Sequence, residues 1–164
     1  MKKNLILLLI FSTTIMSFAQ QSSIKSFKGY FNFSYNEESG SITMEVKELN
    51  KEFLYVSSLS SGIGSNDIGL DRGQLGGERI VKFIKTGNKL LLVQPNQDYR
   101  ALTDNELERN SIEQAFAKSV LFGFPIQQEK EGSYFIDVTP FLLQDMHGVS
   151  NRLKQSGEGQ YNLD

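Results

Sequence analysis

The candidate functional residues of this sequence lie together in one glycine-rich stretch, residues 60–79. Six of the chain's 14 glycines fall there, threaded with Asn66, Asp67, Asp71 and Arg72. Glycine-rich loops can cradle phosphates, and carboxylate and amide oxygens can bind Ca²⁺. The spacing fits neither chemistry, because Leu70 stands where a P-loop needs lysine and the twelve-residue calcium-loop pattern is absent.

These residues favour a tightly shaped connection between two strands. Ordering a run of glycines costs more entropy than ordering other residues, so the shape of the run must matter. Asp and Asn side chains commonly bond the backbone of their own turn. We predict a structural loop, with a contact surface for another domain or a ligand as the alternative. Within it, we predict a buried or interface ion pair between Asp71 and Arg72.

The rest of the chain offers little for catalysis. It has one histidine, His147, and no cysteine. A catalytic triad needs a serine beside a histidine and an acid, and no serine here lies in a nucleophile-elbow sequence. One imidazole with scattered carboxylates does not make a zinc site. We interpret His147 as a structural or surface residue, and predict no catalytic, cofactor-binding or metal-binding residue in this chain.

Residues 1–19 have the pattern of a signal peptide. Lys2 and Lys3 precede an apolar run at residues 5–11, and the small residues Ser17 and Ala19 predict cleavage after Ala19. The apolar run is too short for a membrane span. We therefore expect an exported protein, periplasmic, in the cell envelope or secreted, with no membrane insertion after cleavage. A polar leader follows at residues 20–27.

Composition limits the partners. The formal net charge is −2 at pH 7, which gives no basic surface for nucleic acid or an anionic membrane. The absence of cysteine excludes disulfides, so packing alone must stabilise the fold.

The apolar pattern predicts an α+β fold: a mostly antiparallel sheet of at most seven strands covered by two α-helices. The first helix begins with a capping box at Thr103 and Glu106 and ends at Gly123. The second begins at Thr139, and an apolar stripe marks its buried face. The residues of that stripe are Leu142, Met146, Val149 and Leu153.

Two turns and the domain limits complete this reading. Gly87-Asn88 and Glu131-Gly132 are hairpin turns, and the apolar run at residues 90–93 is a central strand. Residues 28–155 then form a single domain. Residues 156–164 resemble the start of a further segment, which predicts a truncated chain.

Five blocks of the sequence resemble one family. They include F-L-Y-V-S-S-L-S-S-G-I-G-S-N-D-I-G-L-D-R-G-Q-L-G at residues 53–76 and D-V-T-P-F-L-L-Q-D-M-H-G-V at 137–149, with shorter blocks at 90–96, 99–101 and 115–124. They resemble the N-terminal uncharacterised domain of exported bacterial zinc-dependent metalloproteases, which are metzincin-like.

In that family an H-E-x-x-H motif lies downstream, where its histidines bind zinc and its glutamate activates water. This chain contains no such motif. The resemblance therefore implies a non-catalytic N-terminal accessory domain that supports or positions a downstream catalytic domain through an intramolecular contact. Zinc is expected only in that downstream domain.

The residues leave one alternative open: a stand-alone cell-envelope binding module for a peptide, a glycan or Ca²⁺. A small hydrolase is disfavoured, because no set of acid, base and nucleophile can be assembled.

Overall fold

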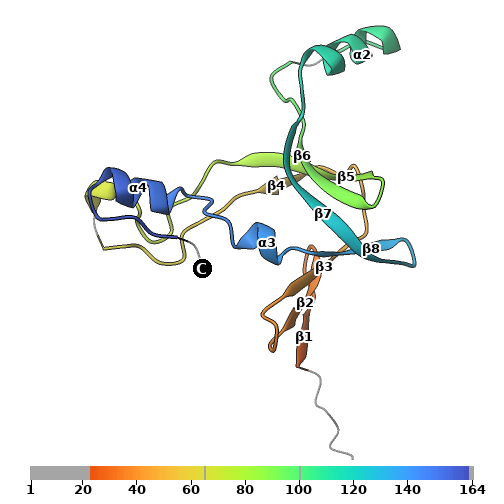
Figure 1. Cartoon of the computed structure of the whole chain (residues 1–164). Coiled ribbons are helices and arrows are strands. Elements are labelled where there is room, and N and C mark those ends of the chain that lie inside the picture. The colour runs from red at the N-terminus through yellow and green to blue at the C-terminus, as the bar shows by residue number, and fades with distance from the viewer. Residues whose placement is uncertain (1–22, 65, 100, 163–164) are drawn as a thin grey trace, which may run out of the picture.

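The computed structural model describes residues 23–64, 66–99 and 101–162, so the predicted signal peptide lies outside the described residues. Within them, eight strands form one antiparallel sheet in the order β1-β2-β3-β8-β7-β6-β5-β4. The sheet curves into a half-barrel (Figure 1). The strands are β1 (Ile24–Phe27), β2 (Asn32–Asn36), β3 (Ile42–Val46), β4 (Phe53–Tyr55), β5 (Arg79–Thr86), β6 (Lys89–Gln94), β7 (Ser119–Lys130) and β8 (Ser133–Asp137).

The predicted α+β fold with two covering helices is wrong. The described residues are mostly β, with eight strands rather than at most seven, and their three α-helices are short. Neither α2 nor α4 buries a single residue, and α2 stands away from the sheet beyond the end of β7 (Figure 1). The helical elements are the 3₁₀ turn η1 (Asn66–Ile68), α2 (Glu106–Ala115), α3 (Thr139–Leu142) and α4 (Val149–Gln155).

The first predicted helix fails at its C-terminal half. Helix α2 ends at Ala115, and β7 begins at Ser119. The cap signals at Gly123 and Pro125 lie inside β7, where Phe124 is buried opposite Leu90 of β6. Alternation of large apolar residues along a strand, which buries one face of the sheet, therefore outweighs the local helix-ending signals.

The second predicted helix is interrupted. It begins at Thr139 as expected, but α3 ends at Leu142 and a new helix, α4, begins at Val149. Gly148 lies between them with a left-handed φ of 62°. The apolar stripe of the sequence is consequently divided between two short helices and the segment that links them.

Strand β7 joins the two halves of the sheet. It pairs with β6 along residues 119–125 and with β8 along residues 126–130, and the register shifts in both ladders. Such irregularities bend a strand and increase its twist. The 12-residue strand therefore carries the curvature of the half-barrel.

Several local predictions are confirmed. Gly87, with a φ of 56°, makes the turn between β5 and β6, and Glu131 and Gly132, with φ of 52° and 77°, make the turn between β7 and β8. Strand β6 lies inside the sheet and buries Leu90 and Leu92. The polar leader predicted at residues 20–27 is wrong in part, because Ile24–Phe27 forms β1, which pairs with β2.

Aromatic rings form the inner side of the half-barrel. Phe53 lies 5.7 Å from Phe83, Phe83 lies 6.1 Å from Phe124, and Phe124 lies 5.7 Å from Phe141, between ring centroids. They border a hollow of ≈ 320 Å³ lined by apolar side chains. We call this lining the concave apolar face; its residues are Phe31, Phe33, Ile42, Met44, Phe53, Tyr55, Phe83, Leu92, Phe124, Val138, Phe141 and Leu142.

Candidate functional site

The glycine-rich stretch folds back on itself beyond the end of β4. Residues 57–63 run outward and residues 70–76 return beside them. The returning amide of Gly73 donates to the Leu59 carbonyl at 2.7 Å, and the amide of Gly76 donates to the Ser57 carbonyl at 2.8 Å. We call residues 57–76, together with α4, the glycine-rich lobe.

Close contacts explain two glycines of the stretch, one with backbone and one with a side chain. A Cβ on Gly62 would lie 2.8 Å from the Arg72 backbone nitrogen, and neither backbone can yield cheaply. A Cβ on Gly76 would lie 2.4 Å from the Ser57 Oγ. Gly64, Gly69 and Gly73 have left-handed φ values instead, and only Gly77 meets neither constraint. The glycines therefore shape the fold of the loop itself.

Helix α4 holds the loop in place (Figure 1). The Arg152 Nη1 donates to the Gly69 carbonyl oxygen at 2.8 Å, across 83 residues of sequence. Leu70, the next residue, is fully buried, although the residues that follow it are exposed. One charged hydrogen bond and one buried side chain thus fasten the returning arm of the loop.

Asp145 positions α4. Its carboxylate accepts hydrogen bonds from the backbone N–H of Val149 at 2.7 Å and of Ser150 at 2.9 Å, at the positive end of the helix. Burial alone raises the pKa of Asp145, but these hydrogen bonds outweigh burial, so its pKa lies below the ordinary value of 3.8. The carboxylate is therefore ionised at neutral pH and committed to the helix.

The residues predicted for the loop lie at its tip and along its returning arm. Asn66 and Asp67 lie in η1, where Asp67 is exposed; the side chain of Asn66 lies outside the described residues. Asp71 and Arg72 are both exposed, and no ion pair joins these two described side chains. The prediction of a buried ion pair between them is wrong, because the backbone at this point turns both side chains toward solvent.

Arg152 and Asp145 are the lobe residues that the sequence reading missed. The sequence analysis assigned Arg152 no role, and nothing in the sequence indicated a carbonyl partner 83 residues away. The signal for Asp145 was present, since an Asp a few residues before an apolar stretch is a common helix cap. The expectation of one continuous helix concealed it.

His147 lies half-buried in the α3–α4 link, next to Gly76 of the loop. Its Cε1 would lie 3.5 Å from a Cβ on Gly76, and its Nε2 is buried with no hydrogen-bond partner among the described residues. The neighbouring carboxylate of Asp145 is bonded to the helix end instead. His147 therefore has a packing position, as predicted, and at a cost, since a buried nitrogen without a partner is unfavourable.

A hollow of ≈ 420 Å³ separates the exit of β4 from the α3–α4 link. Its walls include Tyr55, Leu142, Met146 and His147. The described part of the chain contains no group of three or more His, Cys, Asp or Glu side chains placed to hold a metal ion. Among those same residues, no helix is long and apolar enough to cross a bilayer.

The fold is thus an open antiparallel half-barrel with a glycine-rich lobe at one end. A family described as Domain of unknown function (DUF5117) matches residues 73–164, from the returning arm of the loop through α4. Since the match covers more than half of the sequence, the chain belongs to this family. No curated protein and no solved structure matches the chain.

Proposed function

We propose that the chain is a non-catalytic accessory domain of an exported zinc-dependent metalloprotease, and that it docks a downstream catalytic domain against its concave apolar face. Supporting this, the sequence resembles the N-terminal domain of such proteases and contains no H-E-x-x-H motif. Zinc chemistry, in this proposal, belongs to the catalytic domain, and this chain supplies a rigid support.

The observation that carries the proposal is the uncovered inner face of the half-barrel. Closed barrels fill their interior with side chains from all sides, whereas this sheet closes only half-way. The hollow on its inner side is lined by side chains from β2, β3, β4, β5, β6, β7 and α3. Contiguous apolar surface that borders an open hollow on a soluble domain marks an interaction site.

Other exposed apolar residues fit a large contact surface. Leu102 and Leu107 lie at the start of α2, which projects from the sheet, and both are largely exposed. A helix that buries none of its own residues gains its stability from a partner more readily than from local propensity. The proposal therefore assigns α2 to the same docked assembly.

The most direct genetic test is the reading frame beyond Asp164. We expect it to continue into a region with an H-E-x-x-H motif. A natural stop codon at this point, with no protease frame adjacent, would contradict the proposal and leave the stand-alone binding module as the better account.

Adjacent leucines provide a biochemical test. Leu142 is 53% exposed and lines the concave apolar face, whereas Leu143 is 65% exposed and does not line it. In the full-length protein, Leu142→Glu should weaken packing between the domains, because it places a charge in an apolar contact. We expect faster proteolysis between the domains and reduced peptidase activity.

Leu143→Glu is the matched control and should behave like the unmodified protein in both assays. Equal effects of the two substitutions would count against docking at the concave apolar face.

A further inference from the structure

The outer side of β2 and β3 carries a polar hollow that the proposed docking does not use. Ile42 and Met44 of β3 line the concave apolar face, so the alternating residues Thr43 and Glu45 lie on the opposite face. Two hollows of ≈ 280 and ≈ 270 Å³ adjoin there, and both are bordered by Asn32 and Glu45. We call the two hollows together the outer cleft.

A paired amide and carboxylate form the centre of the outer cleft. The Asn32 Nδ2 donates to the Glu45 Oε2 at 2.8 Å, and the Asn32 carbonyl oxygen has no partner among the described residues. The hydrogen bond from Asn32, followed by that from Ser133, lowers the pKa of Glu45 below its ordinary value. The centre therefore offers fixed planar hydrogen-bonding groups at neutral pH.

Aromatic rings border the cleft on both sides. Tyr30 is 67% exposed and meets Phe31 edge to face, with 4.9 Å between ring centroids. In the second hollow, Phe135 of β8, the register partner of Glu45, borders the same face of the sheet. The exposed Tyr30 ring presents a flat apolar surface beside the polar centre.

Charges around the first hollow balance. The Lys47 Nζ lies 3.5 Å from the Glu45 Oε1, and Lys51 pairs with Glu48. A strongly charged ligand would gain little net attraction here, because each cation of the wall already faces a carboxylate. The first hollow thus favours a ligand that is polar, uncharged and partly flat and apolar.

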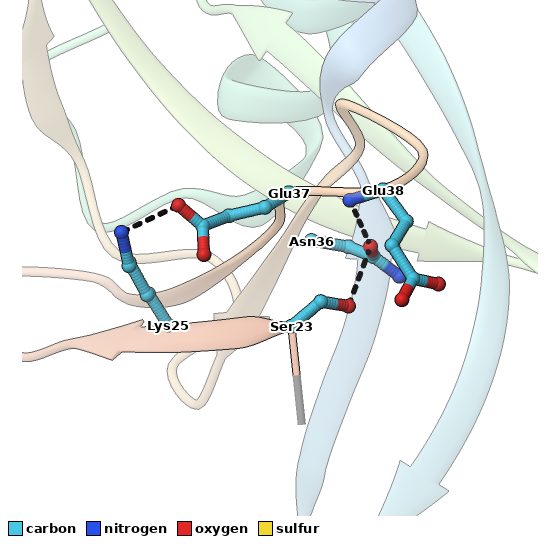
Figure 2. Close-up of polar contacts among 5 residues, drawn as sticks. All are labelled: Ser23, Lys25, Asn36, Glu37 and Glu38. Atoms are coloured by element: carbon cyan, nitrogen blue, oxygen red, sulfur yellow. Dashed lines mark hydrogen bonds and ion pairs between the residues drawn. The ribbon is translucent and has the colours of Figure 1, made fainter. Parts of the chain in front are cut away.

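The strands that carry the cleft are fastened to one another. Figure 2 shows Lys25 of β1 paired with Glu37, and the Asn36 side-chain oxygen accepting from Ser23 and from the Glu38 backbone. These contacts join the edge strand to the turn that follows β2. Such a frame holds β2, which carries Asn32, in place before a ligand arrives, and this reduces the entropy lost on binding.

We propose that the outer cleft binds a neutral oligosaccharide. One sugar ring places its C–H face on the Tyr30 ring, and vicinal hydroxyls of the oligosaccharide form hydrogen bonds with Asn32 and Glu45. The residues that carry the inference, Tyr30, Asn32 and Glu45, are absent from the concave apolar face, although Phe31, Phe33 and Phe53 border both the cleft and that face.

Titration calorimetry of the purified protein tests the proposal. The probes are hexamers of glucose and of N-acetylglucosamine, with an uncharged polar hexapeptide as the competing class. We expect one of the two oligosaccharides to bind. Tyr30→Ala should weaken that binding about tenfold, because it removes a stacking platform.

Tyr161→Ala is the matched control, since Tyr161 is a similarly exposed tyrosine outside the cleft, at 55%. It should leave the affinity unchanged. Because the Tyr30 ring is mostly exposed, Tyr30→Ala should fold, and an unchanged melting temperature checks this. The proposal is overturned if neither oligosaccharide binds at millimolar concentration, if only the hexapeptide binds, or if Tyr30→Ala and Tyr161→Ala bind equally well.

Discussion

At the scale of single residues, the glycines of the loop differ in what they do. Gly62 allows two backbone segments to approach closely, whereas Gly77 lies in open space without a left-handed backbone. The sequence indicated that the run of glycines was shaped, and the shape is confirmed. The sequence could not show which glycine lies at a close backbone contact. The contacting segment is about ten residues away, and its position depends on how the loop returns.

This difference predicts opposite outcomes for two similar substitutions. Gly62→Ala should lower the free energy of unfolding by about 1–3 kcal/mol, because its methyl group would overlap the Arg72 backbone. Gly77→Ala should leave stability unchanged or raise it by about 0.4–1 kcal/mol, because it restricts the unfolded chain. Urea titration of both variants measures the two free energies of unfolding. Equal losses of stability in the two variants would contradict the close contact between Gly62 and the Arg72 backbone.

Asp145 gives the lobe a pH dependence. Its folded pKa lies below its unfolded value, so its carboxylate stabilises the fold at pH values above about 4, and this contribution is lost as pH falls through the folded pKa. Asp145→Ala should cost about 1 kcal/mol at neutral pH through the lost cap. It should also flatten the decline of stability between neutral pH and acid.

Thermal unfolding at several pH values measures both effects. Asp71→Ala, at an exposed residue of the loop, is the control and should retain the slope of the original protein. If the stability of the Asp145→Ala variant fell in acid as steeply as that of the original protein, the capping role would be refuted.

At the scale of elements, the loop and α4 form one structural unit. Arg152 bonds the Gly69 carbonyl, and the peptide after Arg72 is held by the hydrogen bond from Gly73 to Leu59. The sequence predicted an ion pair between Asp71 and Arg72, but both side chains are exposed and form no ion pair among the described residues. Arg152 of α4, distant in sequence, holds the loop instead.

Arg152→Ala should therefore loosen the loop. Losing a hydrogen bond from a charged group costs about 1.5–3 kcal/mol. We expect trypsin to cut after Arg72 several times faster in the variant, measured as the appearance of the peptide that begins at Gly73. Lys154→Ala, in the same exposed last turn of α4, should leave that rate unchanged. Cleavage at the same rate in all three proteins would contradict the contact.

The strands were more predictable than the helices. Short-range signals, such as the glycine turn at Gly87 and the alternation from Ile42 to Val46, specified hairpins correctly. The predicted helix boundaries at Thr103 and Gly123 are wrong. Asn105, not Thr103, caps α2, and Gly123 lies in β7. A pattern that suits both a helix face and a strand is decided by its distant partners, here β6 and β8, which a local reading does not see.

At the scale of the whole molecule, the half-barrel has its core but not a closed interior. Nine buried side chains form that core, and the aromatic rings between them border the open concave apolar face. The sequence predicted aromatic strands but not their curvature, because the bends come from register shifts along β7. The proposed docking of a catalytic domain gives this uncovered face a partner.

Labelling of introduced cysteines in the full-length protein tests that docking most directly. The chain has no cysteine of its own, so Leu142→Cys and Leu143→Cys each add one thiol to it. Docking at the concave apolar face predicts that the thiol at residue 142 reacts with a maleimide at least about tenfold more slowly than the thiol at residue 143, because a partner buries it. Mass spectrometry of the peptide that contains residues 142 and 143 measures the two labelling rates. Equal rates at the two residues would contradict docking at the concave apolar face.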